Sequence, residues 1–520
     1  MDTWILLFLL TGAIAIYYYF FKNLKFFEKY GITHIPPWPI VGNMGPVFLR
    51  QISLAENIQK VYYLNKDAKY VGFFDGMNPI VMIRDPDLIK AIGVKNFETF
   101  PDHRAFVDEV NDPLFGKNLF SLRGEKWRDV RTLLSPAFTS SKMKTMFKLM
   151  SDCAANFTDY LANLPADKNI MEMKNSLTRY TNDVIATCAF GVSVDSMRNP
   201  NNEFYVYGKE ATSFSTLRTI KFYISRSIPL LAKMLGIKFV SNNVGEFFKD
   251  LVRSTIHTRD IKNIVRPDML QLMMETRGKR GPGKELTIED MTAQAFIFFF
   301  GGFDTVSSLM CFAVHEIAVN PDVQAKLRDE IDEALKTNNG DLTYEILNGM
   351  QYLDAVINEA LRKWPIAVFL DRLNVEDFEL PPALPGDKPF LLKKGMNVWF
   401  PVYGLHRDPK YFEKPDEFDP ERFLDENKKS INSAAYIPFG LGPRMCIGNR
   451  FALLETKVML FHLLSRCELK MCAKTSHPLQ LSKKNFTMLA EDGFWLKIQA
   501  RDNANVFSNV GNHSAPNGHI

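Results

Sequence analysis

The feature that most constrains this chain is an uncharged, apolar run near its N-terminus. Residues 3–21 read TWILLFLLTGAIAIYYYFF and contain no charged side chain. As an α-helix rising 1.5 Å per residue, the run measures roughly 28 Å, close to the hydrocarbon thickness of a bilayer. Three tyrosines, residues 17–19, lie toward its C-terminal end, where aromatic side chains favour the membrane interface. We therefore expect residues 3–21 to be a transmembrane anchor.

The charges that flank this run indicate its orientation. Lys22, Lys25 and Lys29 follow it, whereas only Asp2 and the amino terminus precede it, so the positive-inside rule places the rest of the chain in the cytosol. A cleaved signal peptide is the alternative, but no basic residue precedes the run and the run is too long. Residues 22–43 are basic and rich in proline, which predicts a stiff hinge.

The composition is that of one large globular body at residues 44–500. Hydrophobic residues make up 46% and charged residues 23%, which excludes wholesale disorder, and a net charge of +4 is too small to indicate nucleic-acid binding. The six cysteines form no C-x-x-C pair, which favours a reducing compartment over a disulfide framework.

Periodicity predicts that most of this body is helical. Helices are expected at residues 320–337 and 350–363, among others, and short strands at 70–84, 372–380 and 396–400. Residues 501–520 are rich in Asn, Ser and Gly, a composition typical of a disordered tail.

The strongest motif is FGLGPRMCIG, from Phe439 to Gly448. A dinucleotide-binding loop is one interpretation, but no third glycine lies at the required spacing. In the other interpretation, Cys446 precedes an apolar helix at 451–464, and the helix dipole together with Arg444 lowers the pKa of its thiol. Thiolates are soft metal ligands, so we expect a metal-cofactor site rather than an ordinary buried cysteine.

This loop resembles the haem-binding loop of the cytochrome P-450 superfamily, the haem-thiolate monooxygenases. The family pattern Phe-x-x-Gly-x-Arg-x-Cys-x-Gly is matched at Phe439, Gly442, Arg444, Cys446 and Gly448. The resemblance covers roughly residues 30–500 and implies a mainly α fold with small β-sheets. It implies haem b as the cofactor and Cys446 as the axial iron ligand, because thiolate ligation favours O–O cleavage.

Further motifs follow in the order expected of this family. The resemblance implies that Glu359 and Arg362, one helical turn apart, form a buried structural triad with Arg422. It also implies which residues hold the carboxylates of the haem, since a planar guanidinium matches a carboxylate. These residues are Trp127, Arg131, Arg372 and Arg444, with Arg104 as a further candidate. A solvated surface charge is the alternative for any single arginine.

Residues 295–319 form an apolar run that Asp304, His315 and Glu316 interrupt, so we expect a buried central helix and not a second span. Gly301 and Gly302 weaken a helix by about 1 kcal/mol each relative to alanine. A threonine hydroxyl one turn later can bond backward to a carbonyl and open the helix. The resemblance makes Thr305 and Asp304 the catalytic pair that delivers protons during oxygen activation; a merely kinked core helix is the alternative.

The resemblance also implies positions that face the substrate, most of them apolar, which favours large lipophilic substrates. They are Phe106, Phe115, Phe214, Phe300, Gly301, Ala367, Val368, Phe369 and Met488. Core packing is the alternative for each of them. Residues 220–240 alternate apolar and basic side chains and are expected to contact the bilayer.

The chain contains no nicotinamide or flavin motif, so the resemblance implies that NADPH supplies electrons through a flavoprotein reductase. Lys126, Arg128, Arg450 and Lys457 are candidates for its docking face. We predict an unspecific monooxygenase of the microsomal, insect detoxifying type, anchored in the endoplasmic reticulum and acting on xenobiotics or plant toxins. The alternatives are hydroxylation of endogenous steroids or fatty acids, hydroperoxide isomerisation on the same fold, and non-catalytic haem carriage or sensing.

Overall fold

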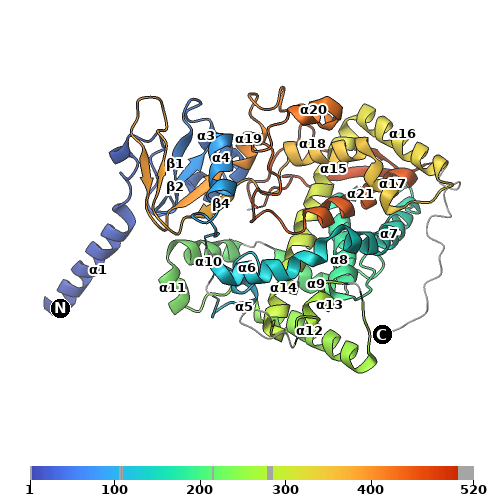
Figure 1. Ribbon diagram of the computed structural model, residues 1–520, viewed down its shortest axis with the longest axis horizontal. Helices are drawn as coiled ribbons and strands as arrows, with labels where there is room; N and C mark the ends of the chain where they lie inside the picture. The colour runs from blue at the N-terminus through green and yellow to red at the C-terminus, as the bar shows by residue number, and fades with distance from the viewer. Residues whose placement is uncertain are drawn as a thin grey trace.

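The computed structural model describes residues 3–104, 107, 109–213, 216–266, 268–277, 285–485 and 487–501. Helices form most of the body, and the largest sheet lies toward the end from which the N-terminal helix projects (Figure 1). The expected mainly helical fold with small sheets is therefore confirmed. Phe106, Phe214 and the tail from residue 502 onward lie outside the described residues.

The N-terminal helix α1 (Thr3–Phe21) coincides with the uncharged run and extends away from the body (Figure 1). The side chains of this helix whose burial is described are mostly exposed; Trp4, for example, is 80% exposed. The remaining described helices follow in chain order. They are α2 (Gly45–Phe48), α3 (Leu54–Tyr62), α4 (Pro86–Lys90), α5 (Pro113–Gly116), α6 (Gly124–Leu134), α7 (Ser140–Ala162), α8 (Met173–Ile185), α9 (Glu203–Thr212), α10 (Thr216–Ser227), α11 (Pro229–Met234), α12 (Asn242–Lys262), α13 (Met269–Met274), α14 (Ile288–Phe300), α15 (Ser307–Val319), α16 (Pro321–Thr337), α17 (Tyr344–Gly349), α18 (Gln351–Lys363), α19 (Val402–His406), α20 (Asp425–Ser430) and α21 (Asn449–Arg466).

Within the described ranges, the strands form three small sheets. They are β1 (Tyr70–Asp75), β2 (Asn78–Ile83), β3 (Ile170–Glu172), β4 (Leu370–Leu373), β5 (Phe378–Leu380), β6 (Phe390–Leu392), β7 (Asn397–Phe400), β8 (Cys467–Lys470) and β9 (Trp495–Ala500). The four-stranded sheet has the order β1-β2-β7-β4, the three-stranded sheet β3-β9-β8, and β5 pairs with β6. In the larger sheet, β1 and β2 form an antiparallel hairpin, and β2 runs parallel to β7 with Ile80 opposite Asn397.

One continuous apolar helix, Ile288–Val319, crosses the centre of the helical part (Figure 1). It begins at a capping box, in which the Thr287 hydroxyl accepts from the amide of Asp290 and the Asp290 carboxylate accepts from the amide of Thr287. Among the described residues it is long and apolar enough to cross a membrane, but 61% of its most apolar window is buried within the protein. It is therefore the expected central core helix, packed against α8, α12 and α18.

Candidate functional site

The loop that precedes α21 has a backbone that only glycine adopts easily. Gly440 and Gly442 have φ values of 82° and 70°. A Cβ atom on Gly442 would lie 2.0 Å from the carbonyl oxygen of Gly93, so the loop approaches a second backbone segment too closely for any side chain. The amide of Cys446 donates to the carbonyl of Phe439 at 2.9 Å, which closes the loop. Its side chain is exposed, as a ligand to a cofactor must be.

The electrostatics of this thiol differ from our expectation. Although the side chain is open to a ligand, the protein atoms packed around the sulfur desolvate it and raise the pKa of Cys446. The amide of Gly448 and the guanidinium of Arg131 act in the opposite direction. Arg444 does not serve the thiol, because its guanidinium donates to Pro101 O at 2.6 Å and to Asp102 at 2.9 Å. The prediction that Arg444 and the helix dipole lower the thiol pKa was wrong for the protein alone. A metal ion deprotonates the thiol that coordinates it. The loop therefore does not need to lower the thiol pKa itself and has only to hold the sulfur within reach of the metal.

The central helix opens at the predicted place. Residues Gly301–Val306 form a π-helical turn, η5, and the Thr305 hydroxyl donates to the carbonyl oxygen of Gly301. Thr305 is exposed, and a Cβ atom on Gly301 would have no neighbour within 4 Å, so open space borders this turn. On the other side, a Cβ atom on Gly302 would lie 3.1 Å from Ile185. Helix α21, which follows the cysteine loop, contacts η5.

Asp304 forms an ion pair that no local sequence pattern predicts. Lys174, in the first turn of α8, places its ammonium group 2.8 Å from Asp304 Oδ1. The same Nζ donates to Ser307 Oγ at 2.7 Å and to Ser308 Oγ at 2.8 Å. No local pattern links residues 174 and 304; only the packing of α8 against η5 brings them together.

Two buried guanidinium groups lie close to the cysteine loop. Arg372 donates to the carbonyl oxygen of Leu441 at 3.2 Å, and the Trp127 ring lies 4.0 Å from the guanidinium carbon of Arg444. Among the described residues, Arg372 Nε and Arg444 Nη1 are buried and have no acceptor. Buried N–H groups normally donate a hydrogen bond, so these two groups indicate a bound molecule that supplies the missing acceptors.

A haem fits this donor set. Its two carboxylates would satisfy the unpaired arginine N–H groups, and its iron would take the exposed thiol of Cys446. Arg131 lies on the thiol side of the same region and donates to the carbonyl oxygen of Met445 at 2.9 Å. Arg104 points elsewhere: its guanidinium donates to Asp75 at 3.3 Å and to the carbonyl oxygen of Arg226 at 2.8 Å.

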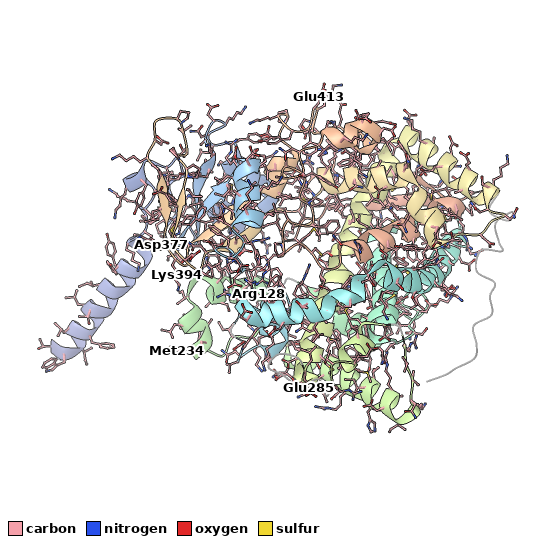
Figure 2. All side chains as sticks on the ribbon, in the orientation of Figure 1. Arg128, Met234, Glu285, Asp377, Lys394 and Glu413 are labelled. Atoms are coloured by element: carbon pink, nitrogen blue, oxygen red, sulfur yellow. The ribbon has the colours of Figure 1, made fainter. Side chains whose placement is uncertain are left out.

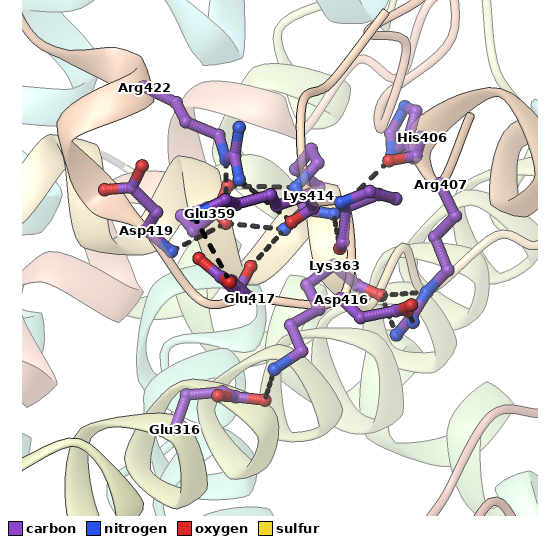
Figure 3. A network of polar contacts seen from close by, with 12 residues as sticks. Glu316, Glu359, Lys363, His406, Arg407, Lys414, Asp416, Glu417, Asp419 and Arg422 are labelled. Atoms are coloured by element: carbon purple, nitrogen blue, oxygen red, sulfur yellow. Dashed lines mark hydrogen bonds and ion pairs between the residues drawn. The ribbon is translucent and has the colours of Figure 1, made fainter. Parts of the chain in front are cut away.

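The expected triad is brought together in the core (Figure 3). Glu359 and Arg362 are fully buried, with Oε1 and Nη2 2.5 Å apart, and Arg422 Nε lies 3.6 Å from the same carboxylate oxygen. The amide of Asp419 also donates to Glu359 Oε1 at 2.9 Å. The cluster ties α18 to the segment 415–422, which precedes the cysteine loop in the chain.

Several of the predicted substrate-facing positions lie near one another. Phe115 packs edge-on against Phe300 at 5.6 Å between ring centroids, in a larger cluster of phenylalanines. Val368 and Met488 line one small cavity. Phe369 instead stacks on Trp399 at 3.9 Å and lines a different cavity beneath α10. Ala367, which directly precedes Val368, is partly exposed.

One residue of the expected docking face is not at the surface. Lys457 is buried and pairs with Asp354 at 3.0 Å, so it cannot contact a partner; that prediction was wrong, because α21 is packed on nearly every side. Lys126 and Arg450 are exposed. Arg128 lies on the outer side of α6 (Figure 2) and forms an ion pair with Glu98.

Comparison with known proteins agrees with this geometry. The family model "Cytochrome P450" matches residues 34–497. Cytochrome P450 9e2 from Blattella germanica is 47% identical over 509 residues, which cover 92% of this chain and 95% of the relative. Probable cytochrome P450 9f2 from Drosophila melanogaster is 41% identical over 94% of this chain and 98% of the relative. Cytochrome P450 6j1 from Blattella germanica is 35% identical over 95% of this chain and 97% of the relative.

Proposed function

The chain belongs to the cytochrome P450 family, and from that premise we propose that it is a membrane-anchored monooxygenase that oxidises lipophilic xenobiotics or plant toxins. The reaction is RH + O2 + NADPH + H+ → ROH + H2O + NADP+. A separate reductase passes the electrons from NADPH. The observation that carries this proposal is the pairing of an exposed Cys446 with a neighbouring π-helical turn that the Thr305 hydroxyl holds open.

In this proposal the bound haem supplies the activation of dioxygen, and the chain supplies ligation, orientation and protons. Cys446 would ligate the iron, while Arg372, Arg444 and Arg131 would hold the carboxylates, with Trp127 packed against Arg444. Thr305 presents its hydroxyl to the open space beside Gly301. Asp304, held by Lys174, exchanges protons between this turn and the outside.

Exposed apolar side chains support attachment to a membrane, which we propose is that of the endoplasmic reticulum. Besides α1, the helices α10 and α11 expose large apolar residues at the edge of the body on the side of α1 (Figure 1). Leu230 is 72% exposed and Met234, at the outer end of α11 (Figure 2), 77%. Apolar patches of this kind, next to an apolar anchor, are typical of a surface that contacts lipid.

The apolar lining favours substrates that are recognised by shape and burial. Phe115 and Phe300 offer ring faces and edges, and Val368 and Met488 offer aliphatic surface. Endogenous steroids and fatty acids meet the same description, so their hydroxylation is the second candidate function. Hydroperoxide isomerisation and haem carriage need neither a proton-delivering pair nor a reductase, and the Lys174–Asp304–Thr305 arrangement argues against both.

The test measures depletion of a mixed panel of lipophilic toxins, steroids and fatty acids by membranes that contain the chain and a reductase. We expect NADPH-dependent loss of many chemically unrelated compounds. Loss of a single class would indicate a biosynthetic hydroxylase, and loss without NADPH would indicate hydroperoxide chemistry. A Cys446→His variant serves as the control: full turnover in that variant would contradict the thiolate assignment.

A further inference from the structure

His103 lies close enough to both buried arginines of the site, Arg372 and Arg444, for their charges to act on it, and it belongs to none of the sequence motifs described above. Its Nδ1 lies 2.8 Å from Asp371 Oδ1, on β4, and its side chain is only 11% exposed. The imidazole stacks on the Phe120 ring, with 4.9 Å between centroids and 18° between planes. These two contacts fix both the position and the plane of the ring.

The segment on either side of His103 is held by the same arginines. Arg444 donates to the carbonyl oxygen of Pro101 and to the carboxylate of Asp102. The amide of Leu373, directly after Arg372, donates to the carbonyl oxygen of Asp102 at 2.8 Å. His103 therefore sits where the Arg372 strand and the Arg444 loop converge, beside the two guanidinium groups that have unpaired N–H groups.

The hydrogen bond to Asp371 determines which ring nitrogen is free. Burial raises the pKa of Asp371, but His103, Arg226 and the amide of Arg104 outweigh it, so this carboxyl is ionised and only accepts. Nδ1 of His103 must then carry a hydrogen. Nε2 has no hydrogen-bond partner among the described residues, which leaves it available to an external group.

The charges around His103 indicate that the external group that binds Nε2 is an anion. Burial lowers the pKa of His103, Arg372 and Arg444 lower it further, and Asp371 acts against them. An anion beside Nε2 would favour the doubly protonated ring and would also meet the unpaired arginine groups. A carboxylate fits, because it accepts several hydrogen bonds at once.

We propose that His103 is a further haem-holding residue, whose Nε2–H donates to a haem carboxylate beside Arg372 and Arg444, with Asp371 as the residue that positions it. This inference rests on the proposed function only in that the chain binds haem. It extends the carboxylate site to a residue that lies near both arginines and that the sequence motifs do not mark.

Two isosteric variants separate this role from a structural one. In His103→Asn, the side-chain amide reaches Asp371 as Nδ1 does but removes the Nε2 donor. In His103→Gln, the longer amide places a donor near Nε2 but loses the contact with Asp371. His257→Asn makes the same chemical change at an exposed position of α12 and is the matched control.

The experiment measures the rate at which haem leaves the full-length, haem-loaded chain for an excess of apomyoglobin. A charge-assisted hydrogen bond is lost in His103→Asn, so we expect haem to leave roughly tenfold faster or more. We expect His103→Gln to lose haem more slowly than His103→Asn, and His257→Asn to match the unsubstituted chain. Thermal unfolding of the haem-free chains should differ little between His103→Asn and the unsubstituted protein, because the contact with Asp371 is kept.

The opposite order, with His103→Gln losing haem faster than His103→Asn, would show that only the Asp371 contact matters and would overturn the proposal. Equal rates for His103→Asn and His257→Asn would overturn it as well. An unsubstituted chain that takes up no haem would instead contradict the proposed function.

Discussion

Replacing Glu359 by glutamine tests the energetic role of the buried triad. Both Glu359 and Arg362 are fully buried, and the carboxylate accepts from Arg362 Nε at 3.0 Å and from Nη2 at 2.5 Å. Glutamine keeps the shape of the Glu359 side chain but removes its negative charge. Its NH2 group would also face the N–H groups that the carboxylate accepts from, those of Arg362 and Asp419, and cannot accept from them. Arg362 retains carbonyl partners, among them Glu417 O at 2.9 Å, but no counter-charge at this distance.

The expected cost follows from this burial. Breaking a buried ion pair by removing one partner destabilises a protein by about 3–5 kcal/mol, because the remaining charge is left uncompensated. An unfolding entropy of about 2.1 cal/mol/K per residue gives roughly 1.1 kcal/mol/K for 520 residues. Glu359→Gln should therefore lower the Tm by roughly 3–5 °C.

The assay is thermal unfolding of the haem-loaded chain, followed by circular dichroism. Glu426→Gln is the matched control, since Glu426 also pairs with a cation three residues later, Lys429, at 2.5 Å, but both side chains are exposed. An exposed pair contributes about 0–1 kcal/mol, so the control should change the Tm by about 1 °C or less. Equal shifts for the two variants would refute the argument that burial makes the triad costly to break.

Three further changes test other parts of the structure. Lys174→Met leaves Asp304 without its cation, and we expect slower turnover at unchanged haem content, measured by product formation against haem absorbance. Asp75→Asn removes the buried carboxylate that pairs with both Arg226 and Arg104. Because Arg226 lies on α10 and would lose its counter-charge, limited proteolysis should cut α10 faster. Burial raises the pKa of Glu455 well above 4.5, so the folded chain keeps a proton that the unfolded chain releases, and stability falls as pH rises above 4.5. Glu455→Gln, neutral at every pH, should lessen that fall in unfolding free energy between pH 4.5 and 7.5; an unchanged pH profile would contradict the assignment.

Local patterns in the sequence were enough to locate much of this protein. The helix predicted at 350–363 is α18, and the one predicted at 320–337 is α16. Both are determined by apolar side chains at helical spacing. The backward bond of Thr305 and the glycine turns at residues 440 and 442 were also predictable, because each depends on residues no more than a few positions apart.

Contacts between distant segments decided the rest. The pairing of Lys174 with Asp304 joins residues 130 positions apart, and the contact of His103 with Asp371 joins residues 268 positions apart. Neither contact can be predicted from the spacing of neighbouring residues in the sequence.

The same reason explains where the sequence misled us about charge. Lys457 has the residue type of a docking cation, but α21 is packed on nearly every side, so its ammonium group is buried against Asp354. The pKa of the Cys446 thiol rises because tertiary packing removes water from it, which a count of nearby basic residues cannot reveal. The sequence by itself determined the ligand loop and the helices; burial, which only the tertiary structure decides, determined how their charges behave.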